Sequence, residues 1–250
     1  MLNTIDILGV LVDVVTMDEA VSRAKSYIAE EKAHTVFTPN SEIIYAAYKD
    51  AGFCKTLNEA DMIIADGIGV VYASKILKAP LPERVPGFDL SCRLLEEANK
   101  DGYSVYFFGG KPGVAEMAIE NLKRDYPDLK VAGFADGYFD AEKEKTIIAD
   151  IKDKQPDILF VCLGAPKQEK WIAEHKDETG AKLLLGVGGS LDVWAGTVER
   201  APEKYQKAGL EWFYRLKKQP SRFFRMLALP KFGLTVLFKG KRVKKGKNNE

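Results

Sequence analysis

Short apolar runs alternate with longer amphipathic stretches through residues 1–190, and this alternation constrains the fold more than any other feature of the chain. Repeated strand–helix units of this kind build a mostly parallel sheet with helices on its faces. Helix-start signals accompany the runs, such as the capping box of Thr16 and Glu19. The expected strands are His34–Thr38, Asp61–Ala65, Tyr103–Phe108, Leu129–Phe134, Asp157–Leu163 and Lys182–Val187. The sequence therefore predicts an α/β protein with a Rossmann-like, mostly parallel sheet flanked by helices.

The charge of the chain is divided unevenly between its two parts. The formal net charge is +1, yet residues 200–250 hold 15 Lys and Arg against three Glu, a local charge of +12. Residues 1–199 carry the opposite excess, a local charge of −11. A basic end on an acidic body is suited to an anionic partner, either a nucleic acid or a lipid surface. We expect an α/β domain with a ligand crevice over residues 1–199 and a basic appendage over residues 200–250, disordered toward its end.

The N-terminal stretch does not read as a signal peptide, because it carries Asp6 and Asp13 and lacks a basic leading region. No uncharged run approaches the ~20 apolar residues that span a bilayer. The most apolar late segment, residues 223–238, is interrupted by Arg225, Pro230 and Lys231. We therefore expect a cytoplasmic protein whose late segment can lie on a membrane without crossing it.

Four of the predicted strands end in polar or glycine-rich turns, at residues 38–42, 65–69, 108–113 and 186–190. Ligands of open parallel sheets bind outside the carboxyl ends of the strands, so we expect these turns to converge on one crevice. Glycines there let backbone N–H groups approach phosphate oxygens, which favours a nucleotide-like ligand. Glycines also end strands in any α/β protein, and this alternative stays open for each single turn.

Several nucleotide and metal motifs are absent from the sequence. Neither GxxxxGK[ST] nor GxGxxG occurs, which argues against a P-loop kinase and an ordinary NAD enzyme. There is no Asp-x-Asp pair, no HExxH and no CxxC, and the two histidines, His34 and His175, are poorly placed to act as bases. We expect no metal and no cofactor, reduced cysteines, and organic groups that meet the phosphate charge.

Seven motifs occur in a fixed order along the chain. They are Thr38-Pro39-Asn40-x-Glu42, Ala65-Asp66-Gly67-x-Gly69, Arg84-Val85-x-Gly87-x-Asp89, Gly164-x-Pro166-x-Gln168-Glu169-x-Trp171, Gly186-Val187-Gly188-Gly189 through Asp192 to Ala195-Gly196, Arg200-Ala201-Pro202, and Gly209-Leu210-Glu211-Trp212 with Arg215 and Pro220-x-Arg222. Together they resemble the WecG/TagA/CpsF glycosyltransferase family over about residues 5–230, most closely its wall teichoic acid branch. Residues 239–250 match no motif.

The resemblance implies the reaction. Members of that branch transfer N-acetylmannosamine from UDP to N-acetylglucosamine carried by undecaprenyl diphosphate, with inversion to a β-linked product. A single displacement of this kind needs one general base near the acceptor hydroxyl and a means of stabilising the departing diphosphate.

Asp66 is the expected base, because it follows a predicted strand and has glycines beside it; the resemblance points to the same position. Its alternative role is the N-cap of the next helix. Arg84 is expected to pair with the diphosphate in place of a metal, and its alternative is a surface ion pair with Glu83 or Asp89.

Neutral side chains are expected to hold the sugar. Thr38 and Asn40 share a polar turn and can bond hydroxyl or acetamido groups, although the turn can also merely reverse the chain. Gln168 lies in the first turn of a helix begun by Pro166, where its amide can face the pyrophosphate or the donor sugar. Trp171 is expected in the core.

The nucleotide is expected near the last glycine turn. Gly188 and Gly189 permit close backbone approach, and Asp192 can accept from the ribose or uracil. Tyr138 can contact the uracil. Asp192 can equally cap a helix, and Tyr138 can be an ordinary packed aromatic.

Apolar residues recur at helical spacing from Lys204 to Lys218, which predicts one basic amphipathic helix that ends before Pro220. The resemblance implies that the appendage approaches an anionic membrane on its cytoplasmic face and completes the site over the lipid-linked acceptor. Arg215 and Arg222 are the candidates for the acceptor diphosphate. Alternatively, the long basic side chains cover the body of the protein. When no membrane is present, the appendage can pack against a second copy of the chain, so a homo-oligomer is a further expectation.

Three other functions compete with this one. A related transferase can use another UDP-sugar, such as UDP-N-acetylmannosaminuronic acid, because one or two contacts separate such donors. A nucleic-acid-binding protein can use the basic tail, but no RNA or DNA module is evident, so no nucleic-acid partner is expected. An epimerase or dehydrogenase needs a dinucleotide site that the sequence lacks.

Overall fold

The computed structural model of the chain describes residues 3–218, 220 and 223–240. Its strands are β1 (Thr4–Ile7), β2 (Val10–Asp13), β3 (His34–Phe37), β4 (Met62–Ile63), β5 (Ser104–Gly109), β6 (Lys130–Ala135), β7 (Ile158–Cys162) and β8 (Leu183–Gly186). Its helices are α1 (Met17–Ile28), α2 (Ser41–Lys49), α3 (Ala51–Asn58), α4 (Ile68–Ile76), α5 (Gly87–Asp101), α6 (Val114–Asp125), α7 (Ala141–Lys154), α8 (Lys167–His175), α9 (Ser190–Trp194), α10 (Glu203–Lys207), α11 (Glu211–Lys218), α12 (Phe223–Met226) and α13 (Ala228–Lys239). The predicted disorder at the end of the chain falls mainly on residues 241–250, which lie outside the described residues.

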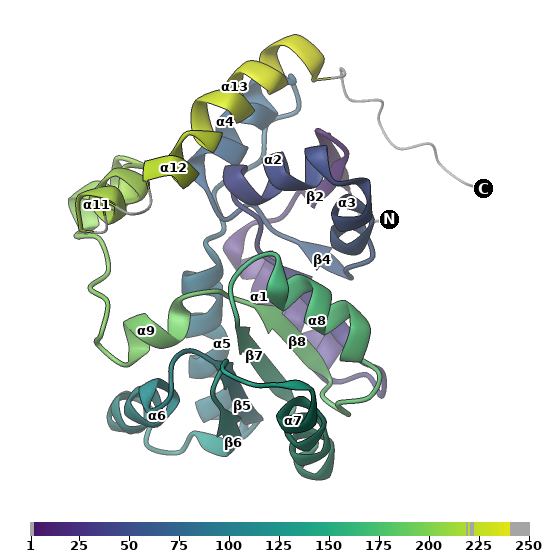
Figure 1. The fold of residues 1–250 in the computed structure, drawn as a ribbon, viewed down its shortest axis with the longest axis vertical. Helices are drawn as coiled ribbons and strands as arrows, with labels where there is room; N and C mark the ends of the chain where they lie inside the picture. Colours follow the sequence, from purple (N-terminus) through teal and green to yellow (C-terminus); the bar gives the residue numbers. More distant parts are fainter. Residues whose placement is uncertain (1–2, 219, 221–222, 241–250) are drawn as a thin grey trace.

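Six strands form one parallel sheet in the order β4-β3-β8-β7-β5-β6, with helices on both faces (Figure 1). The predicted Rossmann-like α/β fold is confirmed, and each of the six predicted strands overlaps one strand of this sheet. The order brings β3 and β8, which are far apart in the sequence, into direct pairing. The turns that follow them therefore lie next to each other.

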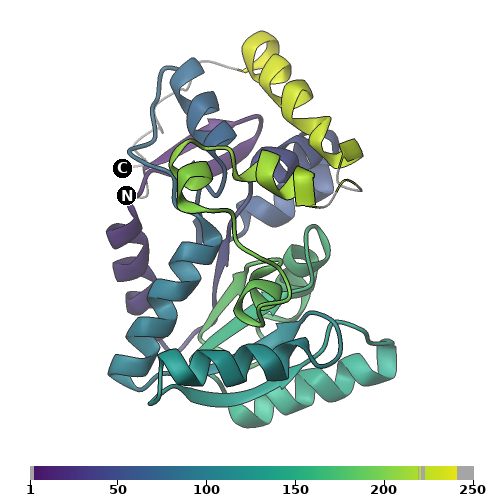
Figure 2. The same ribbon diagram turned by 90° about the vertical axis from the view of Figure 1, so that its left-hand side faces the viewer.

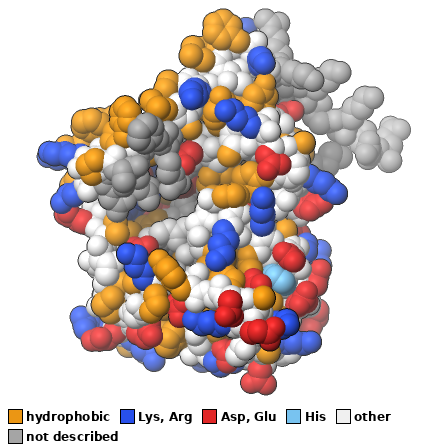
Figure 3. Space-filling view, in the orientation of Figure 1, with side chains coloured by type: hydrophobic (Ala, Val, Ile, Leu, Met, Phe, Trp, Pro, Cys, Tyr) orange, Lys and Arg blue, Asp and Glu red, His pale blue; other side chains and the backbone are white. Residues whose placement is uncertain are grey.

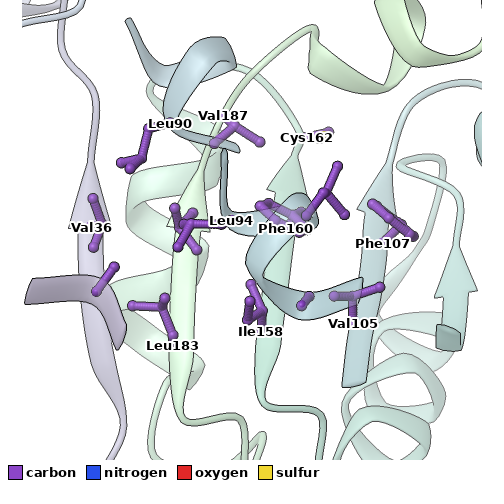
Figure 4. Packing of buried hydrophobic residues seen from close by; sticks show 14 of the residues in the cluster. Val36, Leu90, Leu94, Val105, Phe107, Ile158, Phe160, Cys162, Leu183 and Val187 are labelled. Carbon is purple, nitrogen blue, oxygen red and sulfur yellow. The ribbon is translucent and has the colours of Figure 1, made fainter. Parts of the chain in front are cut away.

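Side chains of the central strands alternate between two cores, as the two-residue period of a strand requires. In β7, Ile158 and Phe160 face the core shared with α1, α5, α6 and α9, and Leu159 and Val161 face the core shared with α2, α3, α7 and α8. Figure 4 shows the first of these cores, where Leu90 and Leu94 of α5 meet the sheet. Figure 2 shows α1 and α5 side by side on this face. Burial on both faces explains why the strands read as continuous apolar runs.

The sequence pattern did not predict the β1–β2 hairpin. The two strands pair antiparallel around Leu8 and Gly9, which both have positive φ angles (55° and 96°), as a tight hairpin turn requires. A Leu in the left-handed region is uncommon, so the pair does not carry the usual Asn-Gly or Asp-Gly signal.

The prediction of a single helix over Lys204–Lys218 is wrong. Gly209 adopts a left-handed conformation with φ of 69° and separates α10 from α11. A Cβ atom at Gly209 would lie 3.0 Å from Ile68 Cγ1, so this break also lets the backbone approach the start of α4. Further on, α13 packs against α2 and α4 and buries Phe232 and Val236 in the second core (Figure 1).

Candidate active site

A cleft of about 270 Å³ opens at the carboxyl ends of β4, β3, β8 and β7, and α11 borders it. Three of the four predicted turns, at residues 38–42, 65–69 and 186–190, contribute to its wall. The fourth, at residues 108–113, does not line the cleft, because it follows β5, on the far side of β7 from the other three. The turn after β7, which holds Gly164, takes its place.

The turn that begins with Thr38 is locked in place by glycines from two other motifs. A Cβ atom at Gly87 would lie 2.7 Å from Thr38 Oγ1, and one at Gly69 would lie 2.3 Å from Ser41 Oγ. At Gly87 the whole branched Thr38 side chain would be in the way, whereas at Gly69 the Ser41 hydroxyl would have to rotate aside. Gly87 is therefore the glycine that the close approach to this turn requires.

Thr38 and Asn40 have defined structural partners within this turn. Thr38 Oγ1 donates to the carbonyl of Gly186 at 3.0 Å, which ties the ends of β3 and β8 together. Asn40 is the N-cap of α2, and its Oδ1 accepts from the N–H groups of Glu42 and Ile43. The Asn40 Nδ2 amide is then the donor that this side chain can offer to a ligand in the cleft.

Asp66 lies at the base of the cleft and is not the N-cap of α4, a position that Gly67 fills without a side-chain bond. Asp66 Oδ1 accepts from the Gly87 N–H group at 3.0 Å. Burial raises the pKa of the Asp66 carboxyl, and the nearby Glu211 carboxylate raises it further, against the opposing effects of the Gly87 N–H group and the Arg215 and Arg84 guanidinium groups. A carboxylate in this setting is a stronger base than one in water.

Arg84 pairs with neither of the residues considered from sequence. Its Nη1 donates to Glu211 Oε2 of α11 at 2.5 Å, and both side chains are largely shielded from solvent. Glu83 instead accepts from the Met17 N–H group, and Asp89 pairs with Arg200. Arg84 therefore links the α/β body to α11 at the edge of the cleft.

Gln168 is buried and joins two turns of the cleft. Its Oε1 accepts from the N–H groups of Gly164 at 3.1 Å and Gly188 at 2.9 Å, and its Nε2 donates to Glu169 Oε1. Burial raises the pKa of the Glu169 carboxyl. Gln168 therefore fixes the turns after β7 and β8 relative to each other, in addition to lining the cleft. Trp171 lies in the core, as predicted.

The residues predicted to hold the nucleotide are only partly brought together. Gly188 and Gly189 line the cleft, whereas Asp192 and Tyr138 are not among its lining residues. Asp192 lies in α9, and a Cβ atom at Gly189 would be 3.7 Å from its Oδ2. Tyr138 is 61% exposed and follows β6, the edge strand farthest from β4.

Arg215 lines the cleft from α11, and Arg222 lies outside the described residues. Within residues 3–218, 220 and 223–240, no group of three or more His, Cys, Asp and Glu side chains could hold a metal ion. Over the same residues, no helix is both long and apolar enough to cross a membrane.

Sequence reasoning missed several residues of the cleft. Glu211 and Trp212 line it beside Arg215, although their motif had been quoted for the resemblance alone. The spacing of Glu211 and Arg215, four residues apart on one helix, was the available signal that both face the same way. Met226 and Leu229 also line the cleft, and no local pattern marks them.

The fold and the cleft define a class of protein: a Rossmann-like enzyme with a carboxylate, guanidinium groups and glycine-rich turns at one sheet edge. The sequence model of the glycosyl transferase WecG/TagA/CpsF family matches residues 5–246, and the chain belongs to this family of glycosyltransferases. The match extends beyond about residue 230, where the resemblance expected from the motifs ends.

Named relatives are similar over most of the chain. An N-acetylglucosaminyldiphosphoundecaprenol N-acetyl-beta-D-mannosaminyltransferase of Bacillus subtilis (strain 168) is 39% identical over 214 residues, which cover 85% of this chain and 82% of that protein. A protein of the same name from Staphylococcus aureus (strain MRSA252) is 37% identical over 245 residues, 97% of this chain and 96% of that protein.

Proposed function

We propose that this enzyme transfers N-acetylmannosamine from UDP-N-acetylmannosamine to the N-acetylglucosamine of an undecaprenyl-diphosphate lipid, with inversion, to form a β-linked disaccharide lipid. The names of relatives that align over most of the chain support the sugar and the acceptor. The observation that carries the mechanism is the meeting of Asp66, Arg84 and Arg215 around one cleft at the carboxyl edge of the sheet. Such a cleft combines a base with cations suited to a diphosphate.

The reaction is a single displacement at the anomeric carbon. The acceptor hydroxyl oxygen forms a bond to that carbon as the bond from the carbon to the β-phosphate oxygen breaks. Asp66 accepts the hydroxyl proton, and UDP leaves with the electron pair of the broken bond. Burial of Asp66 in the cleft keeps it basic enough for this step.

Positive groups of the protein stabilise the departing diphosphate in this proposal. Arg84 provides a fork of N–H donors, and the backbone N–H group of Gly189, which also lines the cleft, is a further donor; the Gly188 N–H group already donates to Gln168. Thr38 and Asn40 then face the donor sugar, with Asn40 donating through its Nδ2 amide. In this proposal the guanidinium and backbone N–H groups of the protein neutralise the charge of the departing diphosphate, and the reaction needs no metal ion.

The nucleotide extends from the cleft along the carboxyl edge of the sheet in this proposal. Asp192 adjoins Gly189, and Tyr138 lies farther along the same edge, where the Gly137 N–H group donates to the Gly110 carbonyl at 2.9 Å. We assign the ribose to the side of Asp192 and the uracil to the side of Tyr138. This arrangement uses the glycine turn after β5, which the cleft itself leaves free.

Residues 200–250 form the membrane-associating appendage in this proposal. Its described helices expose large apolar side chains next to lysines, a composition suited to the interface of an anionic bilayer. Figure 3 shows hydrophobic side chains gathered over the upper part of the molecule, where Figure 1 places α12 and α13. The exposed apolar residues are Leu210, Trp212, Phe213, Phe223, Leu227, Leu234, Leu237 and Phe238. The enzyme then acts at the cytoplasmic face of the membrane, where Arg215 and Arg222 meet the acceptor diphosphate.

The decisive experiment is a donor screen with a synthetic polyprenyl-diphosphate N-acetylglucosamine. UDP-N-acetylmannosamine is expected to give a disaccharide lipid, and UDP-N-acetylmannosaminuronic acid and UDP-glucose far less. Analysis of the linkage is expected to show a β configuration. An α-linked product, or preference for another UDP-sugar, would contradict the proposal.

A further inference from the structure

Four of the charged side chains that line the cleft, two carboxylates and two guanidinium groups, come from both parts of the chain; Glu42 and Arg200 line it as well. Asp66 and Arg84 belong to the α/β body, whereas Glu211 and Arg215 lie one turn apart on α11. Their formal charges sum to zero. Three of them are expected to act on substrate, and Glu211 is the member to which the reaction assigns no task.

Glu211 determines which carboxylate Arg84 contacts. Arg84 donates to Glu211 Oε2 at 2.5 Å, and in the part of the chain that the structure describes no ion pair joins Asp66 to Arg84 or Arg215. The side chains of Arg84 and Glu211 are only 17% and 20% exposed, so solvent and salt screen their attraction less than that of a pair at the surface. Of the carboxylates that line the cleft, Asp66 lies near enough to Arg84 for the guanidinium to lower its pKa, so loss of the Glu211 charge would offer Asp66 to Arg84 as a partner.

A pairing of Arg84 with Asp66 would impair both groups at once. A carboxylate held by a guanidinium is a weaker base, because the cation favours its charged form. The same guanidinium is then turned away from a diphosphate. The Arg84–Glu211 contact exists only while α11 is docked on the body.

We propose that Glu211 is a positioning residue that holds Arg84 apart from Asp66, so that docking of α11 prepares both the base and the diphosphate-binding cation. This inference rests on the proposed function, in which Asp66 accepts the proton and Arg84 meets the diphosphate. It adds a requirement on the appendage that is separate from any contact with the acceptor or the membrane.

Glu211→Gln tests the proposal, because glutamine can still accept a hydrogen bond from Arg84 but carries no charge. The groups that face Asp66 are Arg84, Arg215 and Glu211, and loss of the one carboxylate leaves two cations beside it. We expect kcat to fall about tenfold at neutral pH, with the donor KM within a few-fold. The acid limb of the kcat/KM profile is expected to move to lower pH.

Two further variants make the result specific. Glu203→Gln removes one carboxylate from α10 that is well exposed and paired with Lys207, and it is expected to leave both kcat and the pH profile unchanged. Glu211→Asp retains the charge on a shorter side chain, and it is expected to return the acid limb to its wild-type position. Hydrogen exchange of α11 reports in each variant whether the helix stays docked.

The outcomes separate this proposal from the proposed function. An unshifted acid limb in Glu211→Gln overturns the role of Glu211, whether or not kcat falls, because a contact that merely docks α11 does not alter the base. A rise in kcat also overturns it, since Glu211 would then compete with the substrate for Arg84. If α11 leaves the body in Glu211→Gln, the Glu211→Asp variant is decisive. A Glu211→Asp variant whose α11 stays docked but whose acid limb of kcat/KM is shifted from that of the wild type refutes the proposal. Full activity of Asp66→Asn refutes the proposed function itself, independently of Glu211.

Discussion

Replacing Asp66 with Asn removes the proposed base and changes little else in the cleft. The two side chains are nearly the same size, and the Asn carbonyl can accept from the Gly87 N–H group as Asp66 Oδ1 does at 3.0 Å. Loss of a general base lowers turnover by about 10²–10⁴. That range corresponds to about 3–5 kcal/mol of transition-state stabilisation. UDP affinity is expected to stay within a few-fold, because no contact to the nucleotide is altered.

The pH dependence of the wild-type enzyme follows from the same side chain. Burial raises the pKa of Asp66, and only its ionised form accepts a proton, so activity is expected to fall as pH drops through this raised pKa. The acid limb of kcat/KM is therefore expected above the ordinary carboxyl range of about 4. Residual activity of Asp66→Asn is expected to lack this limb.

The stability of the fold provides an independent check on the raised pKa of Asp66, because the substitution that lowers turnover is not expected to lower stability at neutral pH. Because the folded-state pKa is raised, Asp66 favours the fold below the unfolded-state pKa, and this contribution is lost as pH rises through the folded-state pKa. Asparagine is neutral throughout, so Asp66→Asn is expected to have a Tm equal to or above that of the wild type at pH 7. The difference is expected to shrink in acid.

Turnover, UDP titration and thermal unfolding should be measured on the same preparations. Asp153→Asn is a matched control, because Asp153 is an exposed carboxylate on α7, away from the cleft. It is expected to behave as wild type in all three measurements. Near-normal turnover of Asp66→Asn would refute the assignment of the base, and a large loss of UDP affinity would show that the substitution had disturbed the cleft.

Three other perturbations test separate parts of the site. EDTA is expected to leave turnover unchanged, because Arg84 and backbone N–H groups meet the diphosphate; complete loss that Mg²⁺ or Mn²⁺ restores would overturn this account. Gly87→Ala places a Cβ atom 2.7 Å from Thr38 Oγ1. We therefore expect turnover to fall at least tenfold in kinetic assays and the free energy of unfolding to fall by about 1–3 kcal/mol in denaturant unfolding. Wild-type values would show that the turn at Thr38 can move aside at no cost. Replacing the exposed Lys217 and Lys231 with Glu is expected to weaken binding to anionic vesicles more than about tenfold at low salt, measured by sedimentation. Thermal unfolding is expected to stay unchanged. Unaltered binding would show that these lysines do not contact the membrane.

The pattern of apolar runs was sufficient to locate the six strands of the parallel sheet. Strands such as β7 are buried on both faces, so they read as unbroken apolar runs, and glycine or polar residues mark their carboxyl ends. The grouping of Thr38, Asp66 and Gly188 could be expected from one rule, that ligands bind at this edge. That rule does not give the order of the strands, so it cannot tell which turns are neighbours. For this reason the turn at residues 108–113 was wrongly expected in the cleft.

Contacts between distant segments account for what the sequence did not predict. The partner of Arg84 is Glu211, 127 residues away, and local patterns offered only the nearby Glu83 and Asp89. The helical period of residues 204–218 was real, but Gly209 broke it because the backbone must approach Ile68. In both cases the deciding interaction joins the body to the C-terminal helices, which no short window of sequence can reveal.

The pairing of β3 with β8 also governs when the cleft can form during synthesis. Thr38 and the Gly186 carbonyl, which bond directly, are separated by 148 positions, and β3 and β4 pair only with each other until β8 arrives. A nascent chain that ends before β8 therefore has half of its ligand turns on a two-stranded fragment, which is marginally stable by itself. Closure of so long a loop is a slow, late event in folding. Nascent chains that end before β8 are accordingly expected to lack the cleft, which can form only when the carboxyl half of the sheet has been made.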